Sequence, residues 1–120
     1  DVCLPISKIT ECVKFAEEEV QKFGLRAPMV GHLGDGNFHV LLPYNPEKKE
    51  TYEKIRKFSD ILIEKTLELE GTITGEHGVG LHKKEYLKKE HADNLPTMKL
   101  IKRTMDPNNI MNPGKIFDLN

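Results

Sequence analysis

The sequence lacks the features that mark nucleic-acid-binding and membrane-spanning proteins. Its 18 basic and 19 acidic residues nearly cancel, for a net charge of −1. No positive excess is therefore present to hold nucleic acid or an anionic membrane surface. No stretch approaches the roughly 18 to 20 apolar residues of a spanning helix, and residues 1–5 do not resemble a signal peptide. We expect a soluble chain with no transmembrane segment and no nucleic-acid partner.

Cysteine is also scarce. Cys3 and Cys12 are the only two, and they do not form a CxxC pair. Each has apolar neighbours, beside which cysteine serves as a small buried hydrophobe. This favours reduced thiols in the cytoplasm, with a peripheral position at the inner membrane as an alternative. The first residue is not methionine, which suggests a piece of a longer protein.

A length of 120 residues favours one domain with one core. No repeat, low-complexity tract or linker rich in Pro, Gly or Ser divides the chain. We therefore expect one compact unit.

Apolar residues at three- and four-residue steps predict two long helices. The first begins near Ser7, a suitable N-cap, and ends at Gly24 in a left-handed cap. The second opens at residues 45–46, Asn-Pro, and ends at Gly71. Between them, residues 28–43 predict a β-hairpin.

The second half of the chain predicts shorter elements. Residues 72–80, "TITGEHGVG", predict a brief strand followed by a loop. Short helices are expected over residues 81–89 and 96–105, and residues 105–117, "MDPNNIMNPGKIF", predict an irregular but docked tail. Three apolar side chains of the last helix are expected to face inward: Met98, Ile101 and Met105. The element order indicates an α+β fold in which helices cover one face of an antiparallel sheet.

The stretch "GHLGDGNFH", residues 31–39, places two histidines around an Asp-Gly pair. Such a pair is typical of a two-residue type I′ turn, which would set His32 directly opposite His39. Because side chains alternate across a sheet, both histidine rings are expected on one face and a set of apolar side chains on the opposite face, which packs on the core. The predicted core face comprises Met29, Leu33, Phe38, Val40 and Leu42. Opposed Cβ atoms lie about 4.5–5.5 Å apart, from which two imidazoles can reach one metal ion. A structural pair of histidines is the alternative.

The stretch "TGEHGVG", residues 74–80, offers further reactive groups. Its three glycines let the backbone turn sharply around Glu76 and His77. If Glu76 joined His32 and His39, two imidazoles and a carboxylate would leave coordination positions open, as catalytic metal sites do. His77 suits a general base near neutral pH. A solvated turn without chemistry is the alternative. Two more histidines stand among lysines and glutamates and are expected at the surface: His82 and His91.

Together, "GHLGDGNFH", "GEHGVG" and "MDPNNIMNPGKIF" resemble the C-terminal domain of FAD-linked oxidases and dehydrogenases. This family includes D-lactate dehydrogenase, the glycolate oxidase flavin subunit and D-2-hydroxyglutarate dehydrogenase. The resemblance covers nearly the whole chain. It implies that residues 1–120 are the C-terminal part of the substrate (cap) domain, namely its ferredoxin-like half with a helical tail. It also implies a flavin-binding domain upstream.

The resemblance further implies a reaction and the residues that serve it. A small 2-hydroxy acid would be oxidised to a 2-oxo acid, with hydride transfer to FAD held mainly by the upstream domain. His77 would be the catalytic base that takes the hydroxyl proton. The ligands of a divalent metal, of the Zn or Mn type, would be His32, His39 and Glu76. The tail would return to the flavin through Asn112, Gly114 and Lys115.

One position departs from the family pattern. In some relatives an asparagine two residues after the second hairpin histidine helps to hold the substrate, whereas this chain has Leu41. The change favours a small or partly apolar substrate such as lactate over a dicarboxylate.

Two other classes of function remain open from the residues alone. One is a stand-alone metallohydrolase or oxygenase that uses the same two histidines and one carboxylate. The other is a non-catalytic α+β binding module whose histidines are structural.

Overall fold

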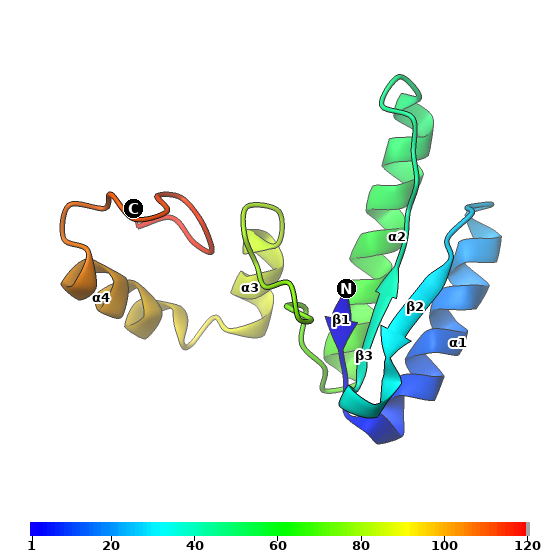
Figure 1. The fold of residues 1–120 in the computed structure, drawn as a ribbon, viewed down its shortest axis with the longest axis horizontal. Helices are drawn as coiled ribbons and strands as arrows, with labels where there is room; N and C mark the ends of the chain where they lie inside the picture. The colour runs from blue at the N-terminus through cyan, green and yellow to red at the C-terminus, as the bar shows by residue number, and fades with distance from the viewer. Residues whose placement is uncertain (120) are drawn as a thin grey trace. The chain divides into compact units, whose positions relative to one another are not determined.

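The computed structural model describes residues 1–119, and they form two compact units (Figure 1). The first is Asp1–Glu76, and the second begins at His77. The single unit expected from the length is therefore wrong. The reason lies in the distribution of buried apolar residues. Among the described residues, Leu87 is the one buried hydrophobic residue of the second unit, and all the others belong to the first.

The first unit is a three-stranded antiparallel sheet with two long helices on one face (Figure 1). The strands are β1 (Val2–Cys3), β2 (Met29–His32) and β3 (Asn37–Val40), in the order β1-β3-β2. The helices are α1 (Ile6–Lys22) and α2 (Lys49–Glu68). The α+β prediction is confirmed, with β1 as a strand that sequence reasoning did not predict. No helix in the described part of the chain is long and apolar enough to cross a membrane.

Helix α1 starts one residue before the predicted N-cap. Pro5 occupies the cap position with φ −51°, so Ser7 lies inside the helix. Proline sets this φ without a capping side chain, which explains why Ser7 is not needed. The predicted end is confirmed, because Gly24 has φ +63° and the N–H of Leu25 donates to the carbonyl of Val20 at 3.0 Å. This hydrogen bond satisfies a carbonyl of the last turn.

Helix α2 begins three residues later than predicted. The side chain of Asn45 accepts a hydrogen bond from the N–H of Glu47 at 2.9 Å, which makes a turn before the helix. At the other end, Glu70 rather than glycine takes the left-handed conformation, with φ +61°. Gly71 instead allows the chain after α2 to pass close to Cys3, because a Cβ at residue 71 would lie 2.6 Å from the carbonyl oxygen of Cys3.

The core of the first unit lies between the sheet and both helices. It comprises Val2, Leu4, Ile9, Cys12, Ala16, Phe38, Phe58, Leu62 and Leu69. Phe38 projects from β3 and is 1% exposed. Both cysteines are free as predicted, although only Cys12 is fully buried. Burial raises the pKa of the Cys12 thiol, which keeps it protonated and inert.

The second unit contains α3 (Lys84–Glu90) and α4 (Leu95–Met105), followed by an irregular tail. Both helices were predicted, and the first starts three residues later than expected. The predicted inward orientation is wrong for two of the three apolar residues of α4, since Ile101 is 59% and Met105 77% exposed, whereas Met98 is half-buried. The described part of the second unit has no strand, and therefore no sheet against which this face could pack.

The tail is docked onto α4, as predicted, and the Asp106 carboxylate holds its first turn. Asp106, at the end of α4, is 6% exposed. Its oxygens accept hydrogen bonds from the N–H groups of Ile110 at 3.0 Å and Met111 at 2.9 Å. Lys102 forms an ion pair with the same carboxylate and donates to the carbonyl of Met111 at 2.6 Å. The Lys102 ammonium, with support from these N–H groups, holds the pKa of Asp106 below its usual value, against the opposing effect of desolvation.

Replacing Gly36 by alanine should destabilise the first unit by about 2–4 kcal/mol. Gly36 has φ +75°, and a Cβ there would lie 2.0 Å from the carbonyl oxygen of Leu4. Gly34 is the matched control, because its Cβ would meet nothing within 4 Å. We expect the urea midpoint to fall for G36A and to change little for G34A. Equal midpoints would show that the approach of Leu4 to the hairpin turn is not tight.

Replacing Asp106 by asparagine should loosen the first turn of the tail, at Ile110 and Met111, at neutral pH. A carboxylate whose pKa is lowered by folding stabilises the fold above its unfolded pKa of about 3.9 and loses this effect as the pH falls through the folded value. Amide exchange at Ile110 and Met111 should therefore speed up in D106N at pH 7 by at least about fivefold. Wild type should approach the variant in acid. The exposed Asp93 provides the control: if D93N behaves like D106N, the assigned contacts are not responsible.

Candidate metal centre

The hairpin that carries the two histidines closes through a wider loop than predicted. Leu33–Asp35 form a turn of 3-10 helix, and Gly36 follows in the left-handed conformation. The register pairs Val30 with His39 and His32 with Asn37, so the predicted pairing of His32 with His39 is wrong by two residues. A competing contact accounts for the difference. The N–H of Leu4 donates to the carbonyl of Gly36 at 2.8 Å, which ties the turn to the chain that follows β1.

A shift of two residues preserves the faces of a strand, whereas a shift of one would exchange them. His32 and His39 therefore still lie on the face opposite the core, as diagonal neighbours. Their ring centroids are 6.1 Å apart and the rings are nearly perpendicular, at 88°. The His39 side chain is 14% exposed, while His32 is exposed. Leu33 has left the predicted core face for the turn and is 53% exposed.

Glu76 joins the two histidines. A glutamate oxygen (Oε1) lies 3.0 Å from Nε2 of His39, and one donor atom from each of His32, His39 and Glu76 lies within 4.8 Å of the other two. The chain reaches this position because Thr72 forms a two-way backbone bridge with Cys3, at 2.7 and 3.1 Å. The brief strand predicted here is reduced to this bridge, followed by turns.

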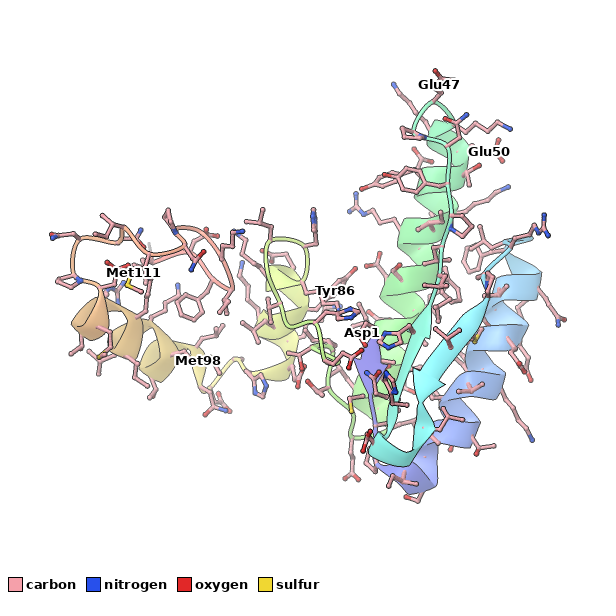
Figure 2. All side chains as sticks on the ribbon, viewed as in Figure 1. Asp1, Glu47, Glu50, Tyr86, Met98 and Met111 are labelled. Carbon is pink, nitrogen blue, oxygen red and sulfur yellow. The ribbon has the colours of Figure 1, made fainter. Side chains whose placement is uncertain are left out.

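Asp1 is a member of the site that sequence reasoning missed (Figure 2). Its Oδ1 lies 3.1 Å from Nδ1 of His39 and accepts a hydrogen bond from Nδ2 of Asn37 at 2.8 Å. Its Oδ2 accepts from the N–H of Glu76 at 3.1 Å. The contact with His39 is an ion-pair distance, and a hydrogen bond between these two atoms would need a rotation of the imidazole ring. No local signal could have found Asp1, because it reaches the site only through the pairing of β1 with β3.

The donor set fits a divalent metal of catalytic type. Two ligands bound at about 2.0–2.1 Å lie about 2.9 to 3.3 Å apart for octahedral or tetrahedral angles. The 3.0 Å between His39 and Glu76 agrees with this spacing, and His32 needs only a modest side-chain movement to complete the set. Two imidazoles and one carboxylate leave positions for water or substrate. The exposure of His32 and Glu76 makes these positions accessible.

The other predicted residues lie in the second unit. His77, the predicted base, directly follows Glu76 and is exposed. In the tail, Asn112 and Gly114 have φ of +48° and +72°, and the N–H of Lys115 donates to the carbonyl of Asn112 at 3.3 Å. The roles of these residues remain predictions. Of the two histidines expected at the surface, His82 is exposed, while His91 is half-buried and paired with Glu90 at 3.2 Å.

Sequence comparison identifies the family to which the chain belongs. The family model of FAD linked oxidases, C-terminal domain, matches residues 1–116. The chain belongs to this family, and the resemblance seen in its three motifs is confirmed.

Three relatives show which members of the family the chain is similar to. The chain is 41% identical to D-lactate dehydrogenase (cytochrome), mitochondrial, of Arabidopsis thaliana, over 98% of this chain and 21% of the relative. It is 39% identical to glycolate oxidase subunit GlcD of Bacillus subtilis, over 98% and 25%. It is 41% identical to D-2-hydroxyglutarate dehydrogenase of Stutzerimonas stutzeri, over 72% and 19%. The chain thus spans about a fifth to a quarter of the length of these relatives.

Proposed function

We propose that the chain is the C-terminal part of the substrate (cap) domain, its ferredoxin-like half with a helical tail, of a flavin-dependent dehydrogenase or oxidase. The enzyme converts a small 2-hydroxy acid, of the D-lactate or glycolate type, into a 2-oxo acid. The observation that carries the proposal is the convergence of His32, His39 and Glu76 on one face of the sheet. The names of the relatives supply the substrate class.

The chemistry divides between bound groups and side chains. FAD, held mainly by an upstream domain, supplies the acceptor for the hydride, because no side chain can store one. A divalent metal of the Zn or Mn type supplies Lewis acidity towards the hydroxyl and carboxylate oxygens of the substrate. His32, His39 and Glu76 hold it, and His77 takes the hydroxyl proton as general base. Asn112, Gly114 and Lys115 serve as the contact of the tail with the flavin.

Apolar side chains beside the histidines favour a small substrate. Val30, which pairs with His39, is 53% exposed, and Leu41 on the same face is 50% exposed. Neither can bind a second carboxylate, which supports a lactate-like acid over a dicarboxylate.

Family membership favours this function over a stand-alone metalloenzyme or a structural module. The cytoplasmic localisation of the chain is still a prediction. The Arabidopsis relative, by contrast, is named as mitochondrial.

The proposal is tested by removing the metal ligands in the longer polypeptide that carries the flavin domain. H39Q and E76Q should bind the metal at least about 100-fold more weakly, since even outer-shell partners of metal sites contribute 10- to 100-fold. Reduction of the flavin by D-lactate should fall with metal content. Elemental analysis and flavin absorbance are the measurements. H82Q, outside the cluster, should change neither.

A variant of His77 separates the base from the ligands. H77N should retain the metal and still bind the substrate, but should slow flavin reduction by at least about 100-fold, in the range of general-base catalysis. A double variant H32Q/H39Q with full metal content would contradict the assigned ligands. Full flavin reduction by D-lactate after complete chelation would contradict the role of the metal.

A further inference from the structure

The Asp1 carboxylate is a buried charge held by donors from separate parts of the first unit. Its side chain is 8% exposed. Burying a carboxylate is costly unless hydrogen bonds replace water. Here the donors are the Asn37 amide at 2.8 Å and the Glu76 N–H at 3.1 Å, with Nδ1 of His39 at 3.1 Å. The carboxylate thus contacts two elements that also carry the candidate metal ligands.

The contact with His39 bears on which ring nitrogen is available to a metal. A neutral imidazole carries its proton on one nitrogen and its lone pair on the other. An ionised carboxylate only accepts hydrogen bonds, so it favours the proton on Nδ1. A metal bound at Nε2, the atom that lies 3.0 Å from Glu76, takes the lone pair there and leaves the proton on Nδ1, beside Asp1. Without a metal, the Glu76 carboxylate competes for the proton at Nε2. Carboxylates that bind the outer nitrogen of a ligating histidine orient the ring and raise its basicity.

The contact with Glu76 fixes the second ligand through its backbone. The N–H of Glu76 donates to Oδ2 of Asp1. The preceding residue, Gly75, has φ +52°, and a Cβ there would lie 2.2 Å from Cγ of Asp1. The loop can close on the carboxylate only because this residue has no side chain. Asp1 therefore sets where the loop carries Glu76.

Asp1 is itself held rigidly. Residues Val2 and Phe38 are paired between β1 and β3, so residue 1 lies opposite residue 39. Asn37, 4% exposed, donates both to Oδ1 of Asp1 and to the carbonyl of Val2 at 3.0 Å. The amide of Asn37 therefore braces the carboxylate against the strand from which His39 projects.

We propose that Asp1 is a positioning residue of the metal centre: its carboxylate holds His39 in the tautomer that presents Nε2 to the metal and anchors the backbone of Glu76 beside it. This inference rests on the proposed metal site. Asp1 does not touch the metal or the substrate, and it acts through two of the three ligands.

The test is D1N in the longer, flavin-loaded polypeptide, with Mn²⁺ and Zn²⁺ as probes. Asparagine has the same size but one acceptor oxygen, so its NH₂ group must face a donor on one side. The affinity for the probe metals should fall about 10- to 100-fold, with flavin content unchanged. D35N is the matched control, because it removes the same charge from an exposed position in the same hairpin. It should bind both metals like wild type.

The tautomer of His39 gives a readout that a merely structural role would not move. In Zn²⁺-loaded wild type with ¹⁵N-labelled histidine, the His39 proton should reside on Nδ1 with Nε2 bound to the metal, and D1N should disturb this arrangement. A proton on Nε2 of His39 in metal-loaded wild type overturns the inference, even if D1N does not fold. So does a D1N protein that binds metal as wild type does. Wild type that binds no metal overturns the proposed function instead, so the two failures are distinguishable.

Discussion

Strand β3 hydrogen-bonds to β2 on one side and to β1 on the other, and the candidate site depends on both pairings. Alternation along β3 sends Phe38 into the core, where it is 1% exposed, and His39 to the opposite face. A slip of one residue would bury an imidazole and expose the phenyl ring. Packing of the core therefore fixes the register, and the register fixes which side chains can meet at the site.

Elements that depend on local sequence were predictable, and those that depend on distant contacts were not. Helix α1 ends at Gly24 as expected, because the left-handed cap is a local property. The predicted hairpin register was wrong by two residues, because Gly36 accepts a hydrogen bond from Leu4, which lies outside the hairpin sequence. Strand β1 is too short to show periodicity. The apolar face of α4 indicated a helix correctly but could not show whether anything covers it.

The same distinction applies to the site. His32 and His39 could be placed on one face from alternation alone, and this survived the register error because the shift was even. Glu76 was suggested by its glycine-rich surroundings and by the family resemblance. Asp1 and Asn37 were missed, because their contacts arise from strand pairing between residues more than thirty positions apart. The ligand types were thus readable, whereas the residues that orient them required the fold.

The central claim is that His32, His39 and Glu76 bind one divalent metal together. A crystal structure of the longer polypeptide with bound Mn²⁺ or Zn²⁺, with anomalous scattering recorded at the absorption edge of the metal, tests it most directly. We expect one peak bound by both imidazoles, with His39 contributing Nε2, and by an oxygen of Glu76, at about 2.0–2.2 Å. A peak bound by other residues, or no peak here in metal-saturated crystals, would contradict the account.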